Sequence, residues 1–453
     1  MTPDTVPWMY GLGTVVMLAT LVSSRFGSRW WLLDPRFAAA LVVWVNAYGQ
    51  VISDDLYGRP APVFGLVESY IPDATLALLL GQLGFTLALF VPTDAPRRAM
   101  PNLELLAPAA GWLAAILAGA VLFTGGIAWW SLVRGGLSAV LSSRYGADQF
   151  STTNPIVGLS YIAVPSAVTL VLHWGQLGRG LTSPWLVAIC SYAVLPSFLT
   201  GGRRDLLMLA AAFAIVGYSR AGRRRVWALL LSAGLIFSLS FLTQASRSGT
   251  SMDPSERLAR TLEAVGSEDL GVVGHGLTAF SGTAVMSASM SVYPSEGAFA
   301  YGRTYVESAA NVLAPRFITG RYLFVTPSNQ FRELFYPTVT GFGFDYSLAA
   351  EGYQNFSFVG PFLAYFAAGL LLSATFQLAR VLRERTSLWP LLHLQTTLAV
   401  LWGIRTDSNT LLKLLVYGDA WLLLLGGLAS VAAIRSLQVS RASYTPGQAV
   451  TRP

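Results

Sequence analysis

Charged residues and cysteines are scarce in this chain of 453 residues. Only 12% of the residues are charged and 53% are hydrophobic, a composition that is too apolar for a soluble globular protein of this length. The single cysteine, Cys190, excludes an intrachain disulfide, so any loop outside a membrane must be ordered by packing alone. These shortages exclude a soluble disulfide scaffold and predict an integral membrane protein.

The chain also lacks the common motifs of nucleotide, metal and nucleic-acid sites. It has no Gly-rich nucleotide loop and no Asp-x-Asp or His-Glu-x-x-His arrangement, so we expect neither a metal nor a cofactor. The formal net charge of +7 does not indicate a nucleic-acid partner, because much of the excess fits a topology signal at the inner leaflet. No internal repeat is evident, which argues against a transporter built from two matching halves.

Apolar stretches long enough to cross about 30 Å of hydrocarbon recur along the whole chain. They do not alternate as β-barrel strands do, so the predicted fold class is all-α, a polytopic membrane protein with about 11 transmembrane helices. Residues 1–453 are treated as a single transmembrane domain. The first stretch has no basic residue before it and no small-residue cleavage signal after it, which predicts a retained helix. The expected spans are 7–23, 30–51, 70–92, 104–124, 155–174, 184–200, 204–219, 226–244, 350–378, 389–404 and 411–433.

The arginines of the short loops set the expected orientation, because cytoplasmic loops are enriched in basic residues. When the spans are threaded alternately, most of these arginines fall on one side, which we assign to the cytoplasm together with the C-terminus. The N-terminus is then outside. The outer side also receives two longer segments, 125–154 and 245–349.

The segment 125–154 is expected to lie in the outer membrane interface. It contains Trp129, Trp130 and several Leu and Val residues at roughly helical spacing, with Ser, Gly and Arg between them. This pattern is typical of an amphipathic helix whose tryptophans lie at headgroup level, and it favours anchoring over direct contact with a substrate.

The segment 245–349 is predicted to be an extracytoplasmic loop subdomain with helices of its own. Asp253 can cap one helix, and Thr304 to Leu313 forms a second one that Pro315 stops. Residues 276–292 are rich in Ser, Gly, Ala and Met and carry no charge, which favours a buried or re-entrant piece. A loop of this length with its own helices is usually functional.

Outward-facing arginines are the main departure from the topology rule, and an anionic substrate explains them. In the turn Gly201 to Asp205, two glycines allow close backbone approach, and two forked guanidinium groups suit the oxygens of a diphosphate. The alternative is that these arginines reach lipid headgroups and pair with Asp205. The outward arginines are Arg203, Arg204, Arg247, Arg303, Arg316, Arg321 and Arg332.

Glu351 and Asn355 begin the expected span 350–378 and are i, i+4 neighbours on a helix. A carboxylate that enters the bilayer needs a partner or a role. Glu351 is therefore either a catalytic base, or the residue that orients one, or a helix-start carboxylate paired with an outer arginine. His275, the only outward histidine, is the alternative base, although an exposed loop histidine is an equally good interpretation.

Other polar and aromatic residues divide into two expected groups. Tyr301 and Tyr353, with Asn355, are candidates for substrate binding, because aromatic faces can stack on sugar rings, although a packed loop core also explains loop aromatics. Asp419, inside the last span, is expected to pair with a neighbouring polar group such as Arg405.

At Gly341 to Gly360 the chain resembles a known family. The pattern G-x-G-x-S-x-x-A-E-x-Y-x-N-F-x-x-x-G is similar to the signature of bacterial O-antigen polymerases, the Wzy-like oligosaccharide repeat-unit polymerases. Here Phe344 and Asp345 lengthen its start, and Ser357 stands where the family commonly has Gly. The other similar stretches are Tyr301-Gly302-Arg303-Thr304-Tyr305, with Pro315-Arg316 after it, and Gly202-Arg203-Arg204.

The resemblance implies a GT-C-like membrane glycosyltransferase on the outer face of the bacterial cytoplasmic membrane. Its donor would be a glycan on a polyprenyl diphosphate, and its acceptor a hydroxyl of a fresh lipid-linked repeat unit. The outward arginines would then bind the leaving diphosphate without a metal, and Glu351 or His275 would take the hydroxyl proton. The implied partners are the lipid-linked oligosaccharides, membrane lipids, a chain-length regulator and a flippase.

Two alternatives stay open. An O-antigen-ligase-like transferase shares the donor chemistry and layout but uses a different acceptor. A lipid-linked-oligosaccharide flippase or exporter belongs to another class and predicts charges that line several spans at mid-membrane. In this chain the charges gather at the outer boundary and in one loop, which favours a transferase.

Overall fold

The protein is described by a computed structural model that covers much of the chain. The described residues form helices joined by turns, and no strand occurs among them, which confirms the all-α fold class for this part of the chain. The description comprises residues 3–23, 34–57, 67–91, 110–133, 162–177, 179–199, parts of 205–216, 282–293, 299–314, 319, 321–335, 346–382 and 388–428.

Long α-helices recur along the chain, and three helices of the described part are extended by a short 3₁₀ or π-helical piece. Two 3₁₀ turns, η1 (Pro3–Thr5) and η2 (Glu68–Tyr70), precede helices, and the π-helix η6 (Leu415–Ala420) continues the last one. The α-helices are α1 (Val6–Ser23), α2 (Pro35–Tyr57), α3 (Ile71–Phe90), α4 (Ala110–Val133), α6 (Ala163–Gln176), α7 (Pro184–Leu199), α12 (Gly282–Val292), α13 (Arg303–Leu313), α15 (Pro327–Phe335), α16 (Leu348–Phe356), α17 (Val359–Leu382), α18 (Leu388–Gly403) and α19 (Ser408–Leu414).

Apolar helices of this kind make the chain a multi-pass membrane protein. Five helical stretches in the described part are long and apolar enough to cross a bilayer, and four shorter apolar helices accompany them. Together these nine overlap nine of the predicted spans. The span 204–219 is helical where it is described, and 226–244 lies outside the described residues, so the count of about 11 stays a prediction. The five are Val6–Ser23, Glu68–Phe90, Trp112–Trp130, Val359–Ala379 and Ser408–Leu428.

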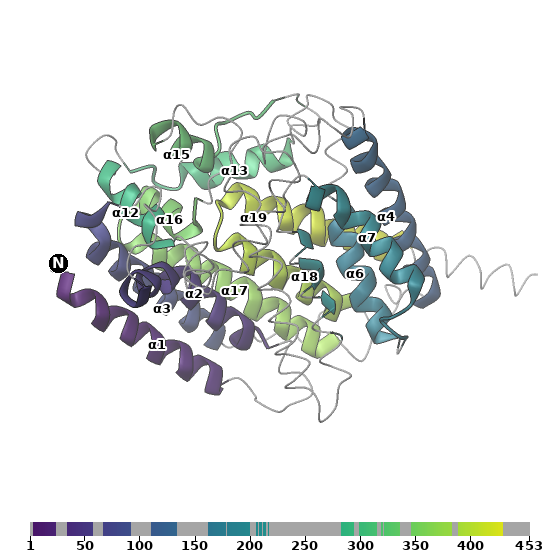
Figure 1. The fold of residues 1–453 in the computed structure, drawn as a ribbon, viewed down its shortest axis with the longest axis horizontal. Coiled ribbons are helices and arrows are strands. Elements are labelled where there is room, and N and C mark those ends of the chain that lie inside the picture. The colour runs from purple at the N-terminus through teal and green to yellow at the C-terminus, as the bar shows by residue number, and fades with distance from the viewer. Residues whose placement is uncertain are drawn as a thin grey trace, which may run out of the picture.

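The helices pack around two hydrophobic clusters that α18 connects. One cluster joins α2, α3, α12, α16 and α17 and includes Val400 and Ile404. The other joins α4, α6 and α7 and includes Leu391 and Leu398 from α18. In Figure 1, α2, α3, α12 and α16 lie at the left and α4, α6 and α7 at the right, with α17 and α18 between them.

The expected span 350–378 consists of two helices. Ser357 adopts φ 56 and ends α16, and α17 begins two residues later at Val359. Gly352 and Gly360 lie against each other, since a Cβ built on Gly352 would be 2.6 Å from the Gly360 carbonyl carbon. The two glycines therefore let α16 pack directly on the start of α17. The candidate membrane span begins at Val359, so Glu351 lies outside it.

The predicted outer segments are described in part. Residues 125–133 continue α4, and Trp129 packs on Tyr192 of α7 with ring centroids 6.1 Å apart. Residues 134–154 and the helix expected at Asp253 lie outside the described residues. The helix expected over Thr304 to Leu313 is confirmed as α13, and the expected buried piece is α12, which is buried from Gly282 to Met290. The assignment of 125–154 and 245–349 to the outer side stays a prediction.

Candidate functional site

One end of the helix bundle brings together parts of the chain that are far apart in sequence. The turn between α18 and α19 lies beside α16, because the Leu348 backbone N–H donates to the Ile404 carbonyl at 3.3 Å. Both α13 and α15 lie across this end, above α16 and α19 in Figure 1. The polar residues of the site come from these four helices and from the turn.

Two of these helices, α16 and α19, begin with a side-chain cap, and α13 begins after a left-handed glycine. The Ser347 hydroxyl caps α16 by accepting the Ala350 N–H at 3.1 Å, and the Asp407 carboxylate caps α19 by accepting the Thr410 N–H at 2.9 Å. Gly302, at φ 87, precedes α13 in a left-handed conformation that suits glycine. These caps fix where the side chains of the first turns lie.

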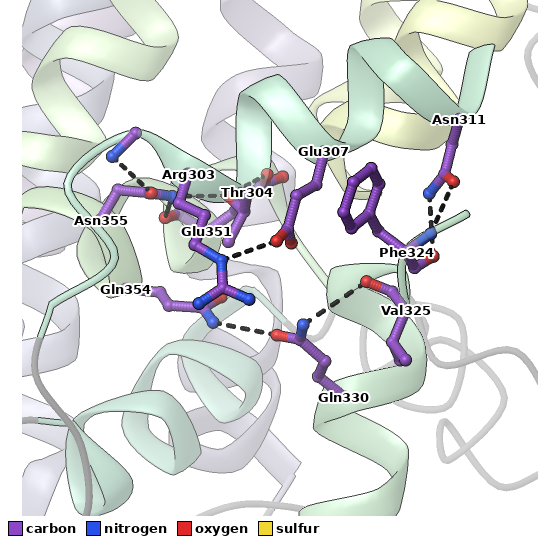
Figure 2. Close-up of polar contacts among 11 residues, drawn as sticks. Arg303, Thr304, Glu307, Asn311, Phe324, Val325, Gln330, Glu351, Gln354 and Asn355 are labelled. Carbon is purple, nitrogen blue, oxygen red and sulfur yellow. Dashed lines mark hydrogen bonds and ion pairs between the residues drawn. The ribbon is translucent and has the colours of Figure 1, made fainter. Parts of the chain in front are cut away.

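Glu351 is the centre of the site. Its side chain is completely buried and bonds to two other helices. Its Oε1 accepts the Thr304 hydroxyl of α13 and the Ser408 hydroxyl of α19, both at 2.7 Å, and its Oε2 accepts the Ser408 N–H at 2.6 Å. Figure 2 shows Thr304 turned toward this carboxyl group. Glu351 thus connects α13, α16 and α19.

Burial changes the acid strength of this group. Burial, and to a smaller extent the nearby Asp407 charge, raise the pKa of Glu351 from 4.5 to about 7. The hydrogen bonds from Ser408 and Thr304 act in the opposite direction, because they stabilise the charged carboxylate. A carboxyl group with a pKa near 7 can hold or release a proton close to neutral pH.

Asn355 fastens the end of α16 to the start of α13. Its Oδ1 accepts the Gly302 N–H at 2.8 Å, and its Nδ2 donates to the Thr304 hydroxyl at 2.7 Å and to the Glu351 carbonyl at 2.8 Å. The side chain is fully buried. The i, i+4 pair expected from the sequence is therefore a single hydrogen-bonded unit with Thr304.

Asp407 joins the loop helix α15 to the last membrane helix. While its Oδ1 caps α19, its Oδ2 accepts the Ser328 N–H at 3.1 Å and the Ser328 hydroxyl at 2.8 Å. The residue is 1% exposed. A single carboxylate thus binds the first turns of two helices, and Ser328 on α15 lies 79 positions before Asp407 in the chain.

The predicted diphosphate-binding arginines are described in part. The Arg303 side chain is 76% exposed, and its Nε lies 2.6 Å from Glu307 Oε1 (Figure 2). Arg332 contacts Glu333 at 3.5 Å, and Arg321 is exposed. The convergence of the outward arginines on one point stays a prediction. Arg203, Arg204, Arg247, Arg316 and the alternative base His275 lie outside the described residues.

The two candidate tyrosines differ in their surroundings. Tyr353 is 5% exposed and packs edge-on against Phe299 and Phe358, with ring centroids 6.1 and 5.6 Å away. Tyr301 is 75% exposed. Of the two, only Tyr301 presents its ring to the surface.

Several residues of the site escaped the sequence analysis. Thr304 and Ser408 bind Glu351. Thr304 lies in the stretch Tyr301 to Tyr305 that resembles the family, but it was not identified as a partner of Glu351, and nothing in the local sequence marks Ser408. Asp407 could have been found, because an Asp before an apolar helical run is a helix-start signal. Arg405 is 5% exposed and its guanidinium group lies 5.1 Å from the centre of the Trp402 ring.

Asp419, which was expected to pair with Arg405 or another polar group, accepts a hydrogen bond from the Thr396 hydroxyl at 2.7 Å in the described part of the chain. The same part contains no group of three or more His, Cys, Asp or Glu side chains that could hold a metal ion. The described side chains of the site carry carboxyl, hydroxyl, amide and guanidinium groups.

These features define a class of protein, a multi-pass helical membrane protein with a buried carboxyl and hydroxyl network at one end of its bundle. The family model described as O-antigen polysaccharide polymerase Wzy matches residues 139–426, more than half of the chain. The chain belongs to this family, as its resemblance over Gly341 to Gly360 indicated. The matched region includes all the helices of the site. Comparison with curated proteins gave no match, and comparison with solved structures gave none either.

Proposed function

We propose that this protein polymerises polyprenyl-diphosphate-linked oligosaccharide repeat units into a surface polysaccharide at the outer face of the cytoplasmic membrane. A hydroxyl of one repeat unit attacks the anomeric carbon of a glycan on a second lipid carrier. A new glycosidic C–O bond forms, the bond from the anomeric carbon to the diphosphate breaks, and the lipid diphosphate leaves. The observation that carries this proposal is the Glu351 network, which joins family motifs from separate parts of the chain beside an exposed arginine.

The outward arginines are proposed to bind the diphosphate. Guanidinium groups match phosphate oxygens with paired N–H donors and stabilise the charge that develops on the leaving group. Arg203, Arg204 and Arg247 are assigned to the membrane boundary. Arg303, Arg316, Arg321 and Arg332 are assigned to the loop that closes over it, and the 76% exposure of the Arg303 side chain supports its part.

Glu351 is proposed to act mainly by orienting the site. Its complete burial and its three hydrogen bonds favour this role over direct contact with substrate. By holding Thr304, it fixes the first turn of α13, where Arg303 begins the helix. Its pKa near 7 also lets it accept a proton passed on through a hydroxyl neighbour. His275 remains the proposed alternative base.

The expected setting of the enzyme follows from the same assignment. The site end of the bundle would face outward, with the N-terminus outside and the C-terminus in the cytoplasm. A flippase would supply the lipid-linked repeat units at this face, and a chain-length regulator would act on the growing glycan. No metal is assigned a role in the proposed step.

The proposal is tested by the glycan length in a deletion strain that carries variants of the chain. Without the protein we expect single repeat units on the lipid carrier, and the wild-type gene should restore long chains. Arg303→Ala, expressed at the wild-type level, should reduce polymerisation at least tenfold, since loss of a charge-stabilising donor costs several kcal/mol.

Arg179→Ala is the matched control. Arg179 is also exposed, and its guanidinium group lies 4.9 Å from the centre of the Trp174 ring, away from the site helices. This variant should polymerise normally. If Arg303→Ala still gave long chains at normal yield, Arg303 would not belong to the site. If the deletion strain contained no single repeat units on the lipid carrier, the protein would be a ligase or a flippase instead.

A further inference from the structure

Tyr301 has an unusual backbone conformation for an exposed residue. Its φ of 47° lies in the left-handed region, which is unfavourable for a residue with a large side chain. Its side chain is 75% exposed, so burial of the ring does not offset this strain. Strained residues of this kind persist where the surrounding structure holds them, and they concentrate at functional sites.

The end of α16 holds the turn in place. The Tyr301 N–H donates to the Asn355 carbonyl at 3.1 Å, and the Gly302 N–H donates to the Asn355 Oδ1 at 2.8 Å. The Ala300 N–H donates to the Gln354 carbonyl at 3.0 Å. Three successive backbone groups are therefore fixed by two residues of α16, and the exposed ring is held out from a rigid base.

A second aromatic ring and a cation lie next to Tyr301. Phe356 is 36% exposed, and its Cζ is 3.4 Å from the position that a Cβ on Gly302 would occupy. Arg303 follows the turn with its side chain 76% exposed. The surface at this point thus combines two aromatic rings with a guanidinium group.

Sugar rings match this combination. A pyranose ring has a face of C–H groups that packs on an aromatic ring and a rim of hydroxyls that accept hydrogen bonds from a guanidinium group. We propose that Tyr301 and Phe356 form a binding platform for a pyranose ring of the lipid-linked oligosaccharide, beside the diphosphate site. This inference rests on the proposed function and adds a separate subsite for the glycan.

Membrane anchoring is the competing explanation for an exposed tyrosine. Anchoring requires only that the ring reaches the interface, and an unstrained turn would serve equally well. A binding platform requires the ring in one fixed orientation, because stacking depends on the alignment of two faces. The strained turn, which three hydrogen bonds to α16 hold in place, therefore favours the binding platform.

Glycine and phenylalanine substitutions at Tyr301 distinguish the effect of the aromatic ring from the effect of the backbone conformation. Tyr301→Gly removes the ring but favours the observed φ, so the variant should fold with an unchanged or higher midpoint of thermal unfolding. Tyr301→Phe keeps the ring. Tyr301→Asn, which also tolerates the left-handed region, serves as a second ring-free variant.

The experiment measures binding of a lipid-free and phosphate-free probe to the full-length protein in detergent. The probe is a short oligosaccharide cut from the polysaccharide of the producing strain. Wild type and Tyr301→Phe should bind it equally, and both ring-free variants should bind about three- to tenfold more weakly. Val306→Ala is the matched control, because Val306 is 70% exposed on α13 but has no ring.

Two outcomes would overturn the platform. One is equal binding of the probe by wild type and the ring-free variants. The other is no binding of the probe to the wild-type protein. Neither outcome contradicts the proposed polymerase function, which is tested separately by the glycan length in the deletion strain.

Discussion

Glu351 shows how one buried carboxyl group can serve both structure and chemistry. It accepts hydrogen bonds from Thr304 and Ser408, and its removal would leave these donors without this acceptor. Burial raises its pKa to about 7, so the folded protein binds a proton there more tightly than the unfolded chain does. The group is therefore a source of pH-dependent stability.

The sign of this dependence follows from the raised pKa. Between pH 4.5 and about 7 the folded state keeps the Glu351 proton while the unfolded state releases it, so stability falls as the pH rises through this window and levels off above it. The total effect is on the order of 3 kcal/mol. Glu351→Gln cannot titrate, and its unfolding midpoint should depend less on pH.

Thermal unfolding of both proteins in detergent from pH 4 to 8 measures the difference. The Gln variant should also be less stable overall, because its amide has one acceptor oxygen where the carboxylate accepts three hydrogen bonds on two oxygens. Parallel pH profiles would contradict the raised pKa.

At the scale of elements, the joint between α16 and α17 separates the site from the membrane. Ser357 adopts φ 56 and ψ −147, a region that glycine populates most easily. A glycine at position 357 would adopt this conformation without strain. The sequence shows a serine at position 357, but it does not show that this serine adopts a positive φ, which is what makes the substitution costly.

Two substitutions at this joint should act in opposite directions. Ser357→Gly relieves the strained backbone and should raise stability by about 1 kcal/mol. Gly360→Ala inserts a methyl group against the Gly352 backbone and should lower stability by about 1–3 kcal/mol. Gly119→Ala is the control, because nothing lies within 4 Å of the position of its Cβ.

The midpoints of thermal unfolding of these three variants test the strain at Ser357 and the close packing of α16 on α17. The control should be neutral or slightly stabilised, since alanine is the better helix former. Equal midpoints for Gly119→Ala and Gly360→Ala would mean that α16 does not pack on α17 as described.

The helices were predictable from sequence because hydrophobicity along a membrane span is a local property. The buried piece α12 and the loop helix α13 were also found, from missing charge and from a helical pattern that ends before Pro315. The partners of Glu351 could not be predicted, because Ser408 is 57 residues away and nothing in the intervening sequence specifies the contact. Pairings between distant helices depend on packing geometry, which hydropathy does not contain.

At the scale of the whole molecule, two carboxylates attach the loop helices to the membrane helices. Glu351 binds α13 to α19, and Asp407 binds α15 to α19 through Ser328. Both attachments meet at the start of the last membrane helix. The loop helices should therefore open from the bundle separately, because each has its own carboxylate.

Ser328→Ala tests this independence. The variant loses the 2.8 Å hydroxyl bond to Asp407 but keeps the 3.1 Å bond from its backbone N–H. Amide hydrogens of α15 should exchange about fivefold to tenfold faster, since one net hydrogen bond contributes about 1 kcal/mol. Exchange in α13 and α19 should stay unchanged.

Ser291→Ala provides the comparison, because its hydroxyl donates to the Ala288 carbonyl at 2.7 Å within α12. It should leave the exchange of α15 at the wild-type rate. Faster exchange of α13 and α15 together in Ser328→Ala would show that the loop helices move as one unit. Arg303 of α13 and Arg332 of α15, which are proposed to bind the diphosphate, would then close over the substrate in one step, whereas separate exchange would mean that they engage it independently.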